Sequence, residues 1–406
     1  MSKKMKQHSG YKSYDYLSKD DFEQFEFADP LNWKGMEPYE IPLSEEETRR
    51  LEKIVDNNVV ISIHDHLITM AKDLDRMAAA LKDGRASTPY EALASSYLDA
   101  VVDNQGMYFL IGHEKKGWKW DDCIYDYGMR MADIDHQDLI VRCTRTSDIL
   151  DAKKNGKIAF ISSFESSLMI ENELDRLDIL FGLGTRMLGV TYNDANTLGA
   201  GLGEKKDRGL TNLGYKAVER MNRLGITIDL GHAGDQTSLD VIEASSKPVV
   251  ISHAGARGVW NSNRMKSDEV LEACAKKGGI LGIEAAPHTT MSDKNPPEQN
   301  IESFFEHFRY AVDIMGIDHV GFGPDCCYGD HNGLHHVFSK GLSLGSFLKR
   351  GTTQMPHVDF VKGLENPTEG FNNIVRYLVK SNYSDGDIAK VIGGNIFRVF
   401  KETWPM

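Results

Sequence analysis

The stretch 209-GLTNLGYKAVERMNRLGITIDLGHAGD-235 contains a helix, a turn and a strand that ends next to a histidine. Apolar residues recur in it at helical spacing, at Leu213, Ala217, Met221 and Leu224. Gly225 follows them, as glycine often does just past the last helical turn. The apolar run 226–230 is typical of a buried strand, and His232 comes shortly after it. The stretch therefore predicts one helix–strand unit whose strand ends at a metal-ligating side chain.

The same alternation of a short apolar run and a helical stretch recurs along the chain. The apolar runs are 59–63, 158–161, 187–190, 226–230, 249–251, 280–283 and 320–322, and 108–111 is a candidate for an eighth strand. Strands that alternate with helices indicate parallel βαβ units. Two architectures fit this pattern: an open doubly wound sheet and a closed barrel.

Polar side chains that can bind metal or move protons follow nearly every predicted strand. In chain order they are His64, His66, Glu165, Tyr192, His232, His253, Glu284 and Asp325. The strand ends of an open sheet form a long row, in which distant strands cannot share one ion. In a closed barrel the same ends form a ring around one pocket. We therefore expect an α/β fold of the (β/α)8 TIM-barrel type.

The H-x-H pair at His64 and His66 has a geometric reason to bind metal. Positions i and i+2 of a strand point to the same side, so two imidazoles there can bind one ion. Neutral imidazole and carboxylate suit zinc, and also manganese, iron or cobalt. The sequence thus predicts a metal site at the strand ends.

Composition narrows the class of partner. The 406 residues include 60 acidic and 47 basic side chains, which gives a formal net charge of −13. Such a surface repels phosphate backbones and anionic lipids, so we expect no nucleic-acid or membrane partner. The five cysteines are odd in number and lack a C-x-x-C motif, and neither a secretory signal nor an apolar span is evident. These features predict a cytoplasmic protein.

The chain is expected to form one main domain with two appended features. Residues 1–43 are polar and aromatic-rich without a clear period, which predicts an arm packed on the body or on a second subunit of a homodimer. The barrel should occupy 44–406, and its first helix should begin at the capping box of Ser44 and Glu47. The stretch 326–360 is rich in glycine, histidine and serine, and we expect it to cover the active site as a long loop.

Four stretches of the chain resemble the membrane dipeptidase (renal dipeptidase) family of zinc metallopeptidases, a branch of the amidohydrolase-type barrels. They are 209–235 as quoted above, 252-SHAGARGVWNSNRMKSDEVL-271, 316-GIDHVGFGPD-325 and 392-IGGNIFRVF-400. The resemblance extends over about residues 59–400. It implies a (β/α)8 barrel that binds two zinc ions.

The resemblance also implies a role for eight residues. Five of them would bind the two metal ions: His64 and His66 the first, His232 and His253 the second, and Glu165 both as a bridge. Three would act on the substrate: Asp325 as acid and base, Arg264 as the partner of a substrate carboxylate, and Tyr192 as a further substrate contact.

Two of the chain's departures from the family pattern change the charge of the site. The first strand of the family ends in H-x-D, and His66 stands here in place of the aspartate, which makes the first metal site less negative by about one charge. Glu284 follows the run 280–283, and an acid there would repel a substrate carboxylate. We expect Glu284 to point into the pocket and to select a substrate with a cationic or amide-donor group.

The predicted function is hydrolysis of the amide bond of a dipeptide or related small amide. The nucleophile would be a hydroxide that bridges two divalent metal ions, with Zn²⁺ the expected metal and Mn, Fe or Co as alternatives. A second interpretation keeps the barrel and the metal but places a non-peptide amide, a lactam or a deamination substrate in the site. A third interpretation is a non-catalytic, metal-stabilised binding protein.

Overall fold

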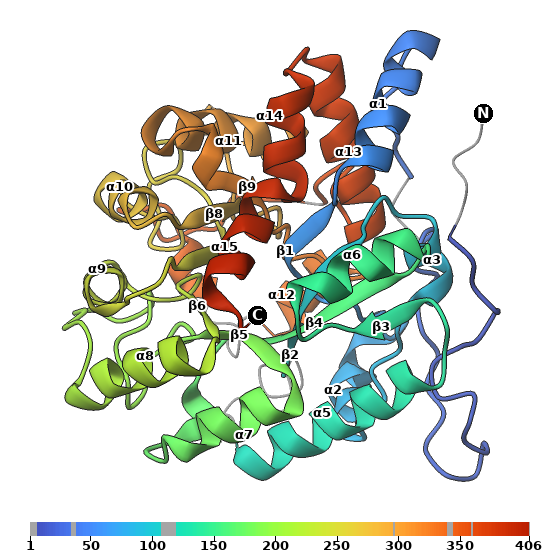
Figure 1. Ribbon diagram of the computed structural model, residues 1–406, viewed down its shortest axis with the longest axis horizontal. Helices are drawn as coiled ribbons and strands as arrows, with labels where there is room; N and C mark the ends of the chain where they lie inside the picture. The colour runs from blue at the N-terminus through green and yellow to red at the C-terminus, as the bar shows by residue number, and fades with distance from the viewer. Residues whose placement is uncertain are drawn as a thin grey trace.

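The computed structural model describes residues 6–33, 38–106, 119–294, 297–338, 344–358 and 360–405. Eight parallel strands form the central sheet in the order β1-β2-β4-β5-β6-β7-β8-β9. Their bounds are β1 (Ile61–Asp65), β2 (Ala100–Gln105), β4 (Ile158–Phe164), β5 (Thr185–Gly189), β6 (Thr227–Asp229), β7 (Val250–Ala254), β8 (Ile280–Ile283) and β9 (Val320–Phe322). In Figure 1 these strands lie inside a ring of helices.

The strand order curls the sheet into a (β/α)8 barrel. No ladder joins β9 to β1 among the described residues, but the backbone N–H of Asp325 donates to the carbonyl oxygen of His64 at 3.1 Å. This bond joins the carboxyl ends of the first and last strands. The predicted barrel is confirmed, and the open doubly wound sheet is excluded, because the first and last strands lie side by side.

Helices follow most of the strands and cover the outside of the barrel (Figure 1). Those described are α1 (Glu45–Asn57), α2 (Met77–Lys82), α3 (Tyr90–Ala94), α5 (Trp120–Asp135), α6 (Thr146–Lys154), α7 (Asp175–Leu183), α8 (Asn212–Leu224), α9 (Asp235–Ala244), α10 (Asp268–Lys276), α11 (Ile301–Met315), α12 (His331–Val337), α13 (Pro367–Lys380), α14 (Asp385–Ala389) and α15 (Asn395–Thr403). Two predicted boundaries are confirmed. Ser44 and Glu47 form the capping box of α1, and α8 ends at Gly225 in the left-handed conformation, with φ 86°.

Two strands were not predicted from the apolar runs. Strand β2 is only half apolar, because Val101 and Val102 are followed by Asp103, Asn104 and Gln105, yet it fills the second position of the barrel. Strand β3 (Ile140–Arg142) pairs with the first half of β4. The second half of the same edge of β4 pairs with β5. The candidate strand 108–111 lies outside the described residues.

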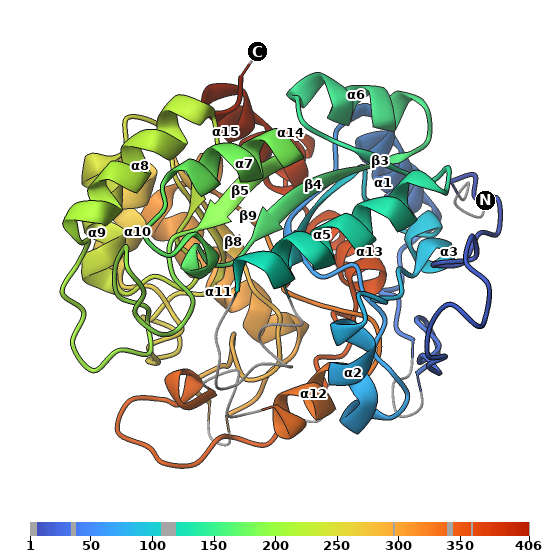
Figure 2. The same cartoon turned by 90° about the horizontal axis from the view of Figure 1, so that it is seen from below.

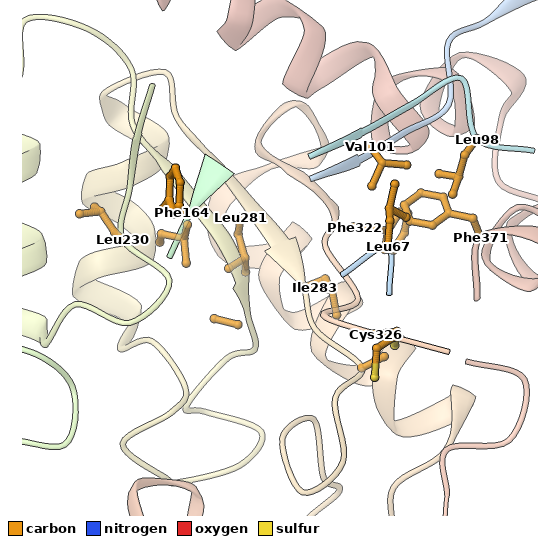
Figure 3. Packing of buried hydrophobic residues seen from close by; sticks show 14 of the residues in the cluster. Leu67, Leu98, Val101, Phe164, Leu230, Leu281, Ile283, Phe322, Cys326 and Phe371 are labelled. Atoms are coloured by element: carbon orange, nitrogen blue, oxygen red, sulfur yellow. The ribbon is translucent and has the colours of Figure 1, made fainter. Parts of the chain in front are cut away.

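The core explains why the strands are continuously apolar. Barrel strands are covered on one face by helices and on the other by the barrel interior, so both faces are buried. Phe322 of β9, for example, is fully buried, and its ring lies 5.3–6.0 Å from the rings of Phe304, Phe305 and Phe308 on α11. Figure 3 shows Phe322 and Leu67 among the members of one cluster of buried residues.

The described part of the N-terminal arm (residues 1–43) packs against the barrel domain, and its tyrosines form hydrogen bonds there. The hydroxyl of Tyr11 and the backbone N–H of Tyr14 both donate to Asp133 of α5, at 2.8 and 2.7 Å. Tyr90 of α3 donates to the same carboxylate at 2.7 Å. The described part of the arm is therefore held against α3 and α5.

The described part of the segment after β9, where we expected a long loop, includes helical turns. It contains α12 and a short 3-10 helix (Leu344–Phe347). Figure 2 shows α12 near α2 on one side of the molecule and the C-terminus on the opposite side. No helix among the described residues is long and apolar enough to cross a membrane.

Candidate metal centre

Side chains from five barrel strands meet at the carboxyl ends of those strands. His64 lies within β1 and His66 just after it, Glu165 follows β4, His232 follows β6, His253 lies in β7 and Asp325 follows β9. The four histidines and Glu165 are at most 4% exposed, and Asp325 is partly buried. Residues separated by up to 261 positions in the chain thus share one neighbourhood.

The first group of this centre consists of two imidazoles around carboxylate oxygens. His66 Nε2 lies 3.1 Å from Glu165 Oε1 and 3.1 Å from Asp325 Oδ1. His64 Nε2 lies 3.1 Å from the same Asp325 oxygen and 3.8 Å from Glu165 Oε1. The ligand atoms of His64, His66 and Glu165 all lie within 4.8 Å of one another, so they could hold one cation.

The second group shares Glu165 with the first. His232 Nε2 lies 3.1 Å from Glu165 Oε2 and 2.9 Å from His253 Nε2. The ligand atoms of Glu165, His232 and His253 also lie within 4.8 Å of one another. Glu165 therefore directs one oxygen to each pair of histidines, which is the arrangement that a carboxylate bridging two cations requires.

Each of the four imidazoles is held at its Nδ1 atom by a neighbouring polar group. The partners are the Asn104 side chain for His64, the Asn104 carbonyl for His66, Asn193 Oδ1 for His232 and Ser252 Oγ for His253. Ser252 Oγ itself donates to Asp229 Oδ2 at 2.7 Å, so it accepts from the Nδ1–H of His253. At His66, His232 and His253 an oxygen accepts from Nδ1–H, which fixes the imidazole tautomer and leaves Nε2 with a lone pair for metal. At His64 the contact is between Nδ1 and the side-chain nitrogen of Asn104, at 2.6 Å.

Burial sets the protonation of the second pair. It lowers the pKa of His232 to about 4, and burial with the neighbouring His64 lowers the pKa of His253 well below its usual range. Both rings are therefore neutral at pH 7. A neutral imidazole with a free Nε2 lone pair is the form that binds metal ions.

The first pair lies in a more negative environment. Burial acts to lower the pKa of His66, but hydrogen bonds to Asp325 and Glu165 outweigh it and raise the pKa well above its usual range. Burial likewise opposes ionisation of both carboxyls, but contacts with the histidines lower the pKa of Glu165 and of Asp325. The two carboxylates favour a positive charge at this point, which a proton or a metal cation can supply.

The residues present fit a pair of divalent cations. Four imidazole nitrogens and a shared carboxylate are donors that zinc, manganese, iron and cobalt accept. The carboxylate of Glu165 faces the imidazoles of His64, His66 and His232, and that of Asp325 faces His64, His66 and the carboxyl group of Glu284. Negative charge, the neutral imidazoles of His232 and His253, and held ring orientations are all present before any ion binds.

Backbone geometry at two strand ends allows this close approach. A Cβ atom at Gly189 would lie 1.9 Å from the carbonyl oxygen of Glu165, so only glycine lets β5 pass against the bridging residue. Asp325 has a φ of 58°, in the left-handed region that non-glycine residues rarely adopt. Strained backbone of this kind is often found at functional sites, where it sets the direction of a side chain.

The three remaining predicted site residues also border the centre. The Tyr192 ring stacks on His232 at 4.1 Å, and burial raises the pKa of Tyr192 well above its usual range, so it keeps its proton. Arg264 donates from Nη2 to Glu284 Oε1 at 2.8 Å, and both side chains are fully buried. Arg264 was expected to face a substrate carboxylate, and in the structure a carboxylate of the chain itself is already there.

The family comparison agrees with this geometry. Residues 125–355 match the model of the membrane dipeptidase family, peptidase family M19. The chain belongs to this family. The resemblance predicted from the sequence is thereby confirmed, although the matched residues do not include His64 and His66.

One curated relative of this M19 chain is an uncharacterized dipeptidase of Schizosaccharomyces pombe. It is 26% identical over 255 residues, which cover 62% of this chain and 54% of the relative. The chain thus spans about half the length of this relative.

Solved structures support the fold. An amidohydrolase from Pseudomonas aeruginosa matches with a TM-score of 0.67 and 24% identity, over 87% of this chain and 99% of that chain. A metallo peptidase from Rhodobacter sphaeroides, liganded with a phosphinate mimic of the dipeptide L-Ala-D-Ala, matches with a TM-score of 0.64 and 18% identity, over 86% of this chain and 100% of that chain. At these identities the likeness shows a shared barrel.

Proposed function

We propose that this M19 chain is a metal-dependent hydrolase that cleaves the amide bond of a dipeptide or a related small amide. The observation that carries the proposal is the position of Glu165, with one oxygen 3.1 Å from His66 and the other 3.1 Å from His232. Family membership and the dipeptide mimic bound by a structural neighbour support the choice of substrate.

Two divalent cations, with Zn²⁺ as the expected metal, would be held by the five residues around Glu165. His64 and His66 would hold one, His232 and His253 the other, and Glu165 both. When bound, such cations supply Lewis-acid polarisation of a carbonyl and a water molecule that ionises near neutral pH. The chain's own part is to fix the ligand atoms and to keep the surroundings dry, which the burial of all five residues provides.

Asp325 is the proposed acid and base. Its pKa is lowered by the histidines that face it, so it is ionised and can accept the proton of the attacking water. The oxygen of this water bonds to the carbonyl carbon, the carbon–nitrogen bond breaks, and Asp325 returns the proton to the leaving amine. The left-handed backbone of Asp325 holds the carboxylate toward His64 and His66 for this transfer.

Tyr192 is proposed to stabilise the oxyanion. Its ring lies against His232, and its raised pKa keeps the phenol protonated as a hydrogen-bond donor. Donors that are already oriented stabilise the developing negative charge without reorganisation during the reaction.

A panel of dipeptides tests the proposal. Purified protein loaded with Zn²⁺ should hydrolyse at least one dipeptide. Each dipeptide is tested both as the free acid and as the C-terminal amide. Release of the amine is measured with ninhydrin or by chromatography. Dialysis against a chelator should abolish the activity, and Zn²⁺ should restore it, because the proposed role of five site residues is to bind the metal ions.

Two other outcomes would change the assignment. Turnover of a lactam or another non-peptide amide, with no dipeptide hydrolysed, would favour the second interpretation. A fully metal-loaded protein that hydrolyses none of these compounds would contradict the proposal and favour a metal-stabilised binding protein.

A homodimer and a cytoplasmic location remain predictions from the sequence. All five cysteines are free and buried, as is common in a reducing compartment. The dimer is the default expectation for a soluble enzyme of this kind.

A further inference from the structure

Arg264 and Glu284 form a fully buried ion pair beside the metal centre. Neither side chain is exposed, and Arg264 Nη2 lies 2.8 Å from Glu284 Oε1. Arg264 also donates to the carbonyl oxygen of Gly231, next to His232. The ligand atoms of Glu284, His253 and Asp325 lie within 4.8 Å of one another, so the pair borders the space where a substrate would meet the metal ligands.

The pair leaves one donor and one acceptor without a partner. Arg264 Nε and Glu284 Oε2 are both buried, and neither has a complementary partner among the described residues, because the carboxylate that Glu284 faces, Asp325, is itself an acceptor. Buried polar groups are normally satisfied, and an unsatisfied one costs free energy. A ligand that offers an acceptor and a donor side by side would satisfy both.

Charge restricts what that ligand can be. A carboxylate entering here would face the carboxyl groups of Glu284 and Asp325, and the guanidinium that could attract it already pairs with Glu284. An ammonium group close to Glu284 would face the guanidinium of Arg264. Because both charged groups meet a like charge, the pair favours a neutral group with an N–H donor.

We propose that Arg264 and Glu284 together bind a neutral amide group of the substrate in place of a free carboxylate. The amide N–H donates to Glu284 Oε2, and the amide carbonyl accepts from the Arg264 guanidinium. This inference rests on the proposed hydrolase function and specifies its substrate: a dipeptide-like compound whose end near Arg264 is a carboxamide. From the sequence, Glu284 was expected to select a substrate with either a cationic or an amide-donor group. This inference selects the amide donor.

Calorimetric titration of the metal-loaded protein tests this with two matched probes. One is the phosphinate mimic of L-Ala-D-Ala with its free C-terminal carboxylate, and the other is the same mimic with a C-terminal carboxamide. The carboxamide should bind at least about tenfold more tightly. In E284Q the preference should fall to below about threefold or reverse, because Arg264 then lacks a counter-charge. The control E269Q makes the same change on an exposed residue of α10 and should keep the wild-type preference.

The outcomes separate the inference from the function on which it rests. If wild-type protein binds the carboxylate as tightly as the carboxamide or more tightly, the inference is overturned and the hydrolase proposal stands. A carboxamide preference that persists in E284Q would also overturn it. If neither mimic binds at millimolar concentration, both proposals fail together.

Discussion

Replacing Asp325 with asparagine should lower kcat by a factor of about 10²–10⁴, the usual contribution of a general acid or base. Asn has nearly the same shape but can neither accept the proton of the attacking water nor return it to the leaving amine. The carboxylate oxygen of Asp325 lies 3.1 Å from both His64 Nε2 and His66 Nε2. Its loss should therefore be measured both as steady-state kcat and as metal content per chain.

Metal content distinguishes two roles for Asp325. If D325N keeps the wild-type metal content and loses activity, Asp325 acts as acid and base. The control D313N changes an exposed aspartate of α11 and should leave both quantities unchanged. A D325N variant with wild-type kcat would show that the acid–base assignment is wrong, and one that loses metal would make Asp325 a ligand.

Replacing Glu165 with glutamine should remove both metal binding and activity. A carboxylate can direct an oxygen to each pair of histidines, whereas an amide offers one oxygen and an NH₂ group with no lone pair for metal. We expect the affinity for at least one ion to fall by more than about 100-fold. Loss of a residue that only hydrogen-bonds to a metal ligand already lowers metal affinity by about 10–100-fold. Competition with a chromogenic chelator measures this affinity.

The control for E165Q should be a charge-matched change away from the barrel mouth. E243Q on α9 replaces an exposed glutamate and should bind metal as wild type does. If E165Q binds two ions with unchanged affinity, Glu165 does not bridge them. Circular dichroism of E165Q, recorded with and without added metal ion, tests whether the variant still folds.

Most of the barrel could be predicted because its strands are buried on both faces. Such strands are short apolar runs, and seven of the eight barrel strands have one. Strand β2 escaped because Asp103, Asn104 and Gln105 make up half of it. The structure gives these polar side chains partners: the Leu67 backbone N–H donates to Asp103, Asn104 contacts His64, and Gln105 donates to Ser162. A polar strand of this kind cannot be told from a loop by apolar pattern alone.

The candidate site could be proposed from sequence because its residues directly follow predicted strands. We call this selection the strand-end rule. It selects residues by their position after a strand, and in the structure those positions converge. The rule does not identify the residues that form hydrogen bonds to the proposed ligands or to their partners, such as Asn193, Ser252 and Asp229. Their role depends on distances across the barrel. It also gave no sign that Glu284 pairs with Arg264, since the two residues lie on different loops.

X-ray diffraction from crystals of the metal-loaded protein, collected at the absorption edge of the bound metal, locates the bound ions directly and so tests whether Glu165 lies between two of them. Two anomalous peaks are expected, one beside His64 and His66 and one beside His232 and His253, with Glu165 between them. A single peak, or peaks bound by other residues, would contradict this arrangement.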